Sequence, residues 1–223
     1  MTRALAINGS PRMEKGKTAL LLNAFAGGLK EGGAEVQTYH ASKLKVQACA
    51  CGSLRCWNEL DGKCCIQDGM QEIYPKLRMA NILILATPMY IPLPGDLQNI
   101  MNRLVALMTP ELVTRDGRTR ARMRDEVNIT KIALIAVSGW WEMENMDTLL
   151  RIARELAEDA SVEFSGALLR PHASYMLSDG EITSAGRGVL AAARQAGIEL
   201  ATLGTMNEAT LNQVSQPLVP RYP

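Results

Sequence analysis

The stretch Asn8-Gly-Ser-Pro-Arg-Met-Glu-Lys-Gly-Lys-Thr18 follows the apolar run 4–7 and precedes the helix-like stretch 19–30. A strand that ends in a Gly/Ser/Pro/Arg turn and then opens a helix directs free backbone N–H groups at one spot. The positive end of the helix dipole points to the same spot. The pattern therefore predicts a strand, a phosphate-binding turn and a helix.

The spacing within this turn excludes two common nucleotide sites. The P-loop pattern G-x-x-x-x-G-K-[ST] does not fit, because six residues separate Gly9 from Gly16. No acidic residue of the Walker B type follows the strand-like runs 81–86 and 131–137, and the fingerprint G-x-G-x-x-G is absent. The turn favours a mononucleotide, with a monophosphate cradle made by Ser10, Arg12, Lys17 and Thr18. A polar turn with a charged first helical turn is the alternative.

Composition limits the class of protein. A chain of 223 residues with 47% apolar residues is long enough for one α/β domain with a substantial core. The net charge of about +1 provides no field that attracts nucleic acid or an anionic membrane. No apolar stretch approaches the roughly 20 residues of a membrane span, and the first residues lack a signal-peptide pattern. We expect a cytoplasmic protein with no nucleic-acid or membrane partner.

Strand-like apolar runs alternate with helix-like stretches along the chain. The expected strands are 3–7, 34–39, 81–86, 131–137 and 165–169, and the expected helices are 18–30, 71–79, 95–108, 147–159 and 184–203. This alternation predicts a three-layer α/β sandwich whose parallel sheet has the order 2-1-3-4-5. Ligands bind at the carboxyl ends of the first and third strands of such a sheet. We expect one domain over 1–205 and an extended C-terminal tail over 206–223.

The loop after the expected third strand is the second candidate for the ligand site. It reads Thr87-Pro-Met-Tyr-Ile-Pro-Leu-Pro94, and its three prolines make it stiff. Met89 and Tyr90 provide a flat platform for a planar ring. The loop Ser138-Gly-Trp-Trp141 adds two aromatic side chains to the same rim. Partly buried loop residues or a subunit interface are the alternative explanation for these aromatic side chains.

These motifs together resemble the NADPH-dependent FMN reductase and flavodoxin-like family. Gly9-Ser-Pro-Arg12 with Lys17-Thr18 is similar to the family's FMN-phosphate segment, and residues 87–103 are similar to the segment along the flavin ring. The resemblance extends over roughly residues 5–203 and implies a flavodoxin-like fold. It implies phosphate contacts from Ser10, Arg12 and Thr18, with the charge of Lys17 nearby. The implied ring and ribityl contacts come from Pro88, Met89, Tyr90, Ile91, Ser138, Gly139 and Trp140.

The resemblance also implies an activity. Hydride would pass from NAD(P)H to N5 of FMN and then to a quinone, a flavin or another acceptor, chemistry that belongs to the cofactor. No side chain is assigned a catalytic role, because the sequence shows no Ser/His/Asp or paired-carboxylate arrangement. A flavodoxin-like or iron–sulfur flavoprotein electron carrier without a pyridine-nucleotide site is the alternative. The expected partners are a small-molecule acceptor or a redox protein, in a homodimer or homotetramer.

Five cysteines lie between Cys49 and Cys65, in an expected Cys-rich loop over 47–68. An odd, crowded set favours reduced thiols for redox or metal work over a secreted disulfide framework. This segment resembles the iron–sulfur flavoprotein branch, where a run C-x2-C-x2-C-x4-7-C binds a [4Fe–4S] cluster. Here the spacing is C-x-C-x4-C-x7-C-C, and Ser53 stands in place of one cysteine. Candidate ligands are Cys49, Cys51, Cys56 and Cys64, with structural zinc, a reactive thiol or no metal as alternatives.

Five arginines lie within the eleven residues Thr114 to Arg124, in an expected basic loop over 114–126. The patch is short and lacks interleaved aromatic residues, which argues against a nucleic-acid site. The alternatives are a solvated loop, attraction of NADPH phosphates, and pairing with acidic residues of another subunit. His172 is expected to be a polar residue in a strand-to-loop turn.

Overall fold

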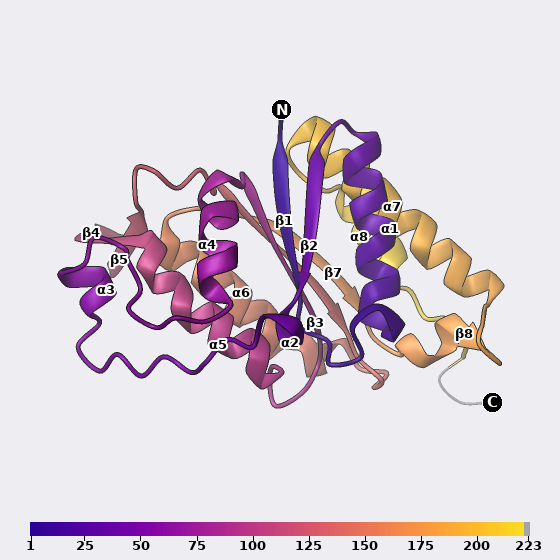
Figure 1. Ribbon diagram of the computed structural model, residues 1–223. Helices are drawn as coiled ribbons and strands as arrows, with labels where there is room; N and C mark the ends of the chain where they lie inside the picture. Colours follow the sequence, from indigo (N-terminus) through magenta and orange to yellow (C-terminus); the bar gives the residue numbers. More distant parts are fainter. Residues whose placement is uncertain (221–223) are drawn as a thin grey trace.

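The computed structural model describes residues 1–220, and five parallel strands form its central sheet. The order β2-β1-β3-β6-β7 matches the predicted 2-1-3-4-5 when only these five strands are numbered. They are β1 (Arg3–Asn8), β2 (Glu35–His40), β3 (Ile82–Pro88), β6 (Lys131–Val137) and β7 (Glu163–Arg170). The chain enters β1 at the top of Figure 1, so the carboxyl ends of the strands lie at the lower edge.

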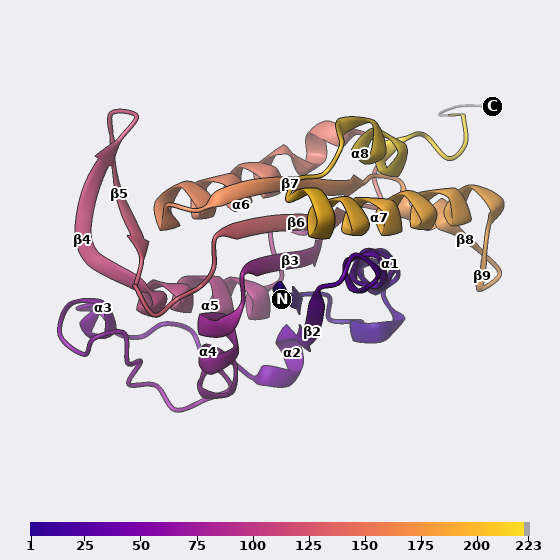
Figure 2. The ribbon, with the colours of Figure 1, turned by 90° about the horizontal axis from the view of Figure 1, so that it is seen from above.

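The alternation of side chains along the strands divides the core into two layers. In β1, Leu5 and Ile7 pack on one face of the sheet, and Ala4 and Ala6 pack on the other. The first face is covered by α4 (Met70–Met79), α5 (Gly95–Arg103) and α6 (Asp147–Ala160), and the second by α1 (Lys17–Glu31) and α7 (Ser184–Leu203) (Figures 1 and 2). The predicted three-layer sandwich is confirmed.

Short elements occupy several connections. They are η1 (Met13–Lys15), α2 (Ala41–Leu44), α3 (Arg55–Asn58), η2 (Leu104–Leu107), η3 (Met143–Met146), η4 (Ala173–Met176), β8 (Leu177–Ser178) and β9 (Glu181–Ile182). The helix expected over 95–108 therefore ends at Arg103 and continues as η2. No helix within residues 1–220 combines the length and apolar character that a membrane span requires.

The basic segment 114–126, predicted as a loop, lies largely within a β-hairpin over residues 108–123. Strands β4 (Met108–Arg115) and β5 (Arg118–Met123) pair in antiparallel fashion, and the hairpin projects from the sheet (Figure 2). Asp116 and Gly117, with φ of 51° and 72°, form the tight turn that such a hairpin needs. The acidic partners of Arg118 and Arg120 belong to α6 of the same chain.

The C-terminal tail is not extended over its whole length, which corrects the prediction for 206–223. Residues Glu208–Ser215 form α8, which packs on α7 and β7, whereas 221–223 lie outside the described residues. Asn207 caps this helix, since its side-chain oxygen accepts a hydrogen bond from Ala209 N at 3.0 Å. The buried Arg170 guanidinium donates to the carbonyls of Val214 and Gln216 at the other end. These two contacts favour a helix here.

Candidate functional site

A cavity opens at the carboxyl ends of β1, β3 and β6, where the fold predicts a ligand site. Its lining comes from three loops that are far apart in the sequence and from the turn after β7. The lining residues are Ser10, Arg12, Gly16, Lys17, Thr18, Pro88, Met89, Tyr90, Val137, Ser138, Gly139, Ala173 and Ser174. Nine of these are residues that the sequence predicted. None of the lining residues carries a carboxylate, so the cavity wall is neutral or positive.

The turn between β1 and α1 has the features of an anion cradle. The first helical amide bonds come from Ala19 and Leu20, which donate to Gly16 O, so the earlier amides of α1 remain directed at the cavity end. A Cβ atom at Gly16 would lie 2.8 Å from Ser10 Oγ. Any other residue at position 16 would therefore crowd the Ser10 hydroxyl, so glycine keeps Ser10 in its place in the turn. A phosphate group fits this donor set, because Arg12 and Lys17 add positive charge.

The loop after β3 forms a second wall. Met89 N donates to Val137 O at 2.8 Å, which ties this loop to β6, and Tyr90 N donates to Pro92 O at 2.9 Å. Pro88 and Met89 are half-buried, while the Tyr90 side chain is 48% exposed. A rigid backbone with an apolar surface suits one face of a planar ring.

The far wall joins the loop after β6 to the turn after β7. Ser138 N donates to Arg170 O at 2.9 Å, and Ala173 N donates to Ser138 O at 2.8 Å. Ala173 and Ser174 also line the cavity, and they were not among the site residues predicted from the sequence. Their position directly after the last strand of a parallel sheet is the signal that would have found them.

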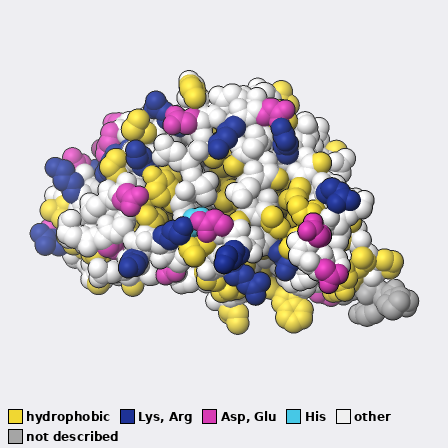
Figure 3. Space-filling view, turned by 45° about the vertical axis from the view of Figure 1, so that its right-hand side comes forward, with side chains coloured by type: hydrophobic (Ala, Val, Ile, Leu, Met, Phe, Trp, Pro, Cys, Tyr) yellow, Lys and Arg dark blue, Asp and Glu magenta, His cyan; other side chains and the backbone are white. Residues whose placement is uncertain are grey.

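Two predicted ring contacts lie outside the lining of the cavity. Ile91 is fully exposed and Trp140 is 63% exposed, and neither side chain lines the wall. The Trp140 amide donates to Ser138 Oγ at 3.0 Å, a local turn that the sequence pattern did not reveal. Tyr90 and Tyr175 are exposed as well, and these four apolar side chains from the segments after β3, β6 and β7 are called the rim below. Hydrophobic side chains also project from the lower edge in Figure 3, beside Lys and Arg side chains.

An aromatic stack stands behind the far wall. The His172 ring lies 3.3 Å from the Trp141 ring and 3.8 Å from the Tyr175 ring, measured between centroids. His172 is 2% exposed, and neither ring nitrogen has a hydrogen-bond partner within residues 1–220. Burial, and then the nearby Arg170 guanidinium, lower the pKa of His172. His172 therefore lies in the turn after β7, as predicted. Its ring is packed between Trp141 and Tyr175, and its lowered pKa favours the neutral form at neutral pH.

The cysteine segment has a different organisation. The Cys51 Sγ accepts a hydrogen bond from Arg55 N at 3.2 Å, which lowers the pKa of the Cys51 thiol. Burial raises the pKa of the Cys56 thiol. Over the part of the chain that the structure describes, no three His, Cys, Asp or Glu side chains are grouped to hold a metal ion. The thiols of Cys49, Cys51 and Cys64 lie near enough to Cys56 to raise its pKa further, but within the described residues they are not arranged as a metal site.

Arginines hold the cysteine loop in place. Arg103 is 1% exposed and contacts both carboxylate oxygens of Asp68, at 2.9 and 3.2 Å. Burial alone would raise the pKa of Asp68, but Arg103 and the amides of Gln47 and Met70 outweigh it and lower the pKa. Arg124 donates to the Asp61 carboxylate, at 2.6 Å, and to a loop carbonyl. Ion pairs and carbonyl contacts therefore fix this loop.

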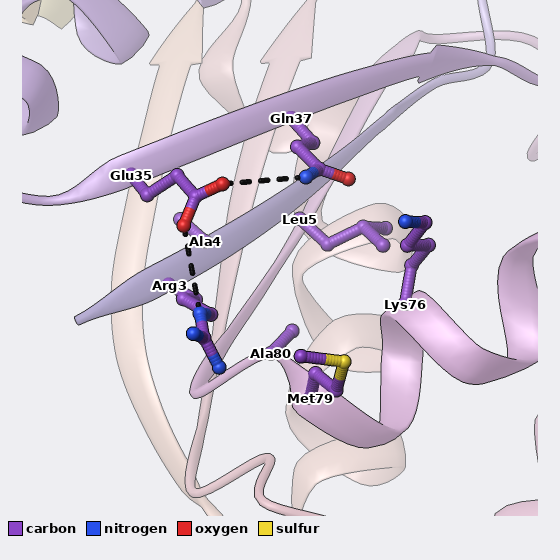
Figure 4. Close-up of a pocket in the computed structure, with 8 residues that line it drawn as sticks. All are labelled: Arg3, Ala4, Leu5, Glu35, Gln37, Lys76, Met79 and Ala80. Atoms are coloured by element: carbon purple, nitrogen blue, oxygen red, sulfur yellow. Dashed lines mark hydrogen bonds and ion pairs between the residues drawn. The ribbon is translucent and has the colours of Figure 1, made fainter. Parts of the chain in front are cut away.

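A second recess lies at the opposite edge of the sheet (Figure 4). It is bounded by the first residues of β1 and β2 and the last turn of α4, at the amino ends of the strands. Arg3 and Glu35 form an ion pair at 3.5 Å in this recess, and Gln37 donates to the same carboxylate. This recess lacks the converging strand-end loops of the first cavity.

Comparison with known proteins decides the family. The family model described as NADPH-dependent FMN reductase matches residues 2–153. The chain belongs to this family. The chain is 38% identical over 104 residues to an iron–sulfur flavoprotein of Methanosarcina thermophila, covering 45% of this chain and 51% of that protein. It is 32% identical over 117 residues to an iron–sulfur flavoprotein of Methanocaldococcus jannaschii, covering 52% and 57%.

The chain thus spans about half the length of the curated relatives that it matches. Among solved structures, an FMN-dependent NADH-azoreductase of Bacillus anthracis in complex with FMN aligns with a TM-score of 0.61 and 14% identity, covering 92% of this chain and 100% of that chain. An NAD(P)H:quinone oxidoreductase of Methanothermobacter marburgensis aligns with a TM-score of 0.59 and 16% identity, covering 89% and 96%. At such identities these structures show the shared flavodoxin-like fold.

Proposed function

We propose that this protein binds FMN in the cavity and is an NAD(P)H-dependent oxidoreductase that reduces a quinone, a flavin or another acceptor. One observation carries the proposal: three strand-end loops meet at one cavity, and each supplies the kind of group that FMN requires. Residues 10–18 offer amides and positive charge for the phosphate, residues 88–90 offer a flat apolar wall, and residues 137–139 close the other side. Family membership supports the same ligand.

Each part of the cavity has a defined task in this proposal. Arg12 and Lys17 neutralise the phosphate, while Ser10 and Thr18 donate hydrogen bonds to it. When bound, FMN supplies the redox chemistry, accepting hydride at N5 and passing electrons on. The protein orients the ring against Met89 and Tyr90 and excludes water from one face. The absence of acidic residues from the lining favours a ligand that gains negative charge on reduction.

The alternative is an electron carrier without a pyridine-nucleotide site. The names of the curated relatives favour it, because they are iron–sulfur flavoproteins. Steady-state oxidation of NADH and NADPH by the purified, FMN-loaded protein separates the two functions. A reductase turns over either dinucleotide with a quinone or free flavin as acceptor, whereas a carrier shows almost no turnover. A protein without flavin absorbance after loading with FMN would contradict both.

The exposed rim supports a homodimer or homotetramer. Tyr90, Ile91, Trp140 and Tyr175 are all among the exposed large apolar side chains, and Tyr90 also lines the cavity. A second copy that packs over this rim would bury apolar surface and shield the ring of the bound FMN. Light scattering during size-exclusion chromatography tests this proposal, since Ile91→Asp with Trp140→Asp should shift the assembly toward the monomer.

A further inference from the structure

Asn8 is a buried polar side chain that the proposed function does not use. It ends β1 and is fully buried, directly before the turn that forms the anion cradle. Its side-chain oxygen accepts a hydrogen bond from Ser10 N at 2.9 Å, and its side-chain nitrogen donates to Met13 O at 3.3 Å. One carboxamide thus contacts the turn at two points, two and five residues further along the chain.

These contacts continue to the groups that face the cavity. Ser10 Oγ accepts a hydrogen bond from Arg12 N at 3.3 Å, and Ser10 O accepts one from Met13 N at 2.9 Å. Met13 has a φ of 48°, a left-handed backbone that costs free energy in a residue other than glycine. The surroundings must hold such a residue in place, and the Asn8 side chain bonds directly to its carbonyl.

We propose that Asn8 is the positioning residue of the phosphate cradle: its carboxamide fixes Ser10 and Met13, and through them sets where Ser10 and Arg12 meet the phosphate of FMN. This inference rests on the proposed function. Asn8 itself is buried beneath the turn and is not among the residues that line the cavity. Its effect on binding is therefore indirect, and it should apply only to ligands that carry the phosphate.

Riboflavin provides the discriminating probe, because it has the ring and ribityl chain of FMN without the phosphate. The dissociation constants of flavin-free protein for FMN and for riboflavin are measured by flavin fluorescence. Asn8→Ala removes both contacts with the turn. We expect it to weaken FMN binding about tenfold or more, the loss typical of removing hydrogen bonds that orient a binding loop, and to leave riboflavin binding nearly unchanged.

Two further variants make the test specific. Asn8→Asp keeps the acceptor for Ser10 N but replaces the donor to Met13 and adds a negative charge near the phosphate, so we expect it to weaken FMN binding more than Asn8→Ala does. Asn81→Ala is the matched control. Its side-chain oxygen accepts a single backbone hydrogen bond, from Arg3 N at 2.9 Å, at the amino ends of the strands. It should change neither dissociation constant.

The outcomes are distinct. Equal weakening of FMN and riboflavin binding by Asn8→Ala would show a general structural role and overturn the inference, as would unchanged FMN binding. Riboflavin binding also reports that each variant is folded, and Asn8→Ser, which is uncharged and too short to reach both Ser10 N and Met13 O, serves if Asn8→Ala does not fold. Failure of the wild-type protein to bind FMN at all would overturn the proposed function as well.

Discussion

The proposed FMN cavity and the cysteine loop were both predicted from clusters of chemically distinctive residues, but only the residues of the cavity converge in the structure. In the cavity, side chains from residues 10–18, 88–90 and 138–139 converge on one space. In the loop, five cysteines lie within seventeen residues of sequence but form no group that holds a metal ion within residues 1–220. Parallel-sheet topology fixes where strand ends meet, whereas spacing along an irregular loop fixes no such geometry.

The largest expected effect tests whether the buried Arg103–Asp68 ion pair maintains the cysteine loop. Arg103→Met leaves the Asp68 carboxylate buried without its partner, and we expect a loss of about 3–5 kcal/mol in the free energy of unfolding. Denaturant titration measures it. The control Arg122→Met removes exposed ion pairs with Glu111 and Asp125 and should cost less than about 1 kcal/mol. Equal effects of the two variants would contradict this account of the loop.

The next effect concerns the cavity. Arg12→Ala combined with Thr18→Ala should weaken FMN binding at least about a hundredfold, because hydrogen bonds to a charged phosphate are the strong ones. Arg55→Ala is the control from the cysteine loop, since Arg55 pairs with Glu59 on the surface. Equilibrium dialysis should show full FMN binding by the control. Stoichiometric FMN retained by the double variant would place the phosphate elsewhere.

Iron content tests the other region. We expect anaerobic reconstitution with iron and sulfide to leave the protein with one flavin and without a stable [4Fe–4S] cluster, because the candidate thiolates are not grouped for a metal. Iron and acid-labile sulfide assays measure this. Cys56→Ser should then leave the iron content unchanged. Four irons per chain, lost in that variant, would show that the loop rearranges around a cluster.

The platform should give a smaller effect. Tyr90→Ala removes an aromatic wall of the cavity and should weaken FMN binding about threefold to tenfold, the range of one aromatic contact, with a shift in flavin potential. Ile91→Ala is the neighbouring control, because Ile91 is fully exposed and does not line the cavity. If Ile91→Ala has the larger effect in the same titration, the ring lies outside the cavity.

The smallest effect is a pH dependence at the far wall. Because the pKa of His172 is lower in the folded state, the unfolded chain takes up the proton first as the pH falls. Stability should therefore decrease as the pH drops below about 6.5, the ordinary histidine value. Thermal unfolding at several pH values should show a weaker decrease for His172→Phe, which keeps the ring stack. An unchanged pH dependence would mean that the pKa of His172 is the same in the folded and unfolded states.

The sequence predicted the sheet and most of the cavity because both follow from apolar alternation and strand-end motifs. It did not predict α8, whose last carbonyls accept hydrogen bonds from the distant Arg170 guanidinium. It also did not predict the β4–β5 hairpin, whose arginines pair with acidic residues of α6. The sequence also did not reveal which side chains of the strand-end loops face the cavity and which face solvent. Ile91 and Tyr90 are adjacent, yet only Tyr90 lines the cavity, because local backbone geometry decides the direction of each side chain.

A calorimetric titration of the flavin-free protein with FMN and with ATP tests the central claim most directly. The account predicts one FMN per chain, bound far more tightly than ATP, and loss of that binding in the variant with Arg12→Ala and Thr18→Ala. Binding of ATP in preference to FMN, or no flavin binding at all, would contradict it.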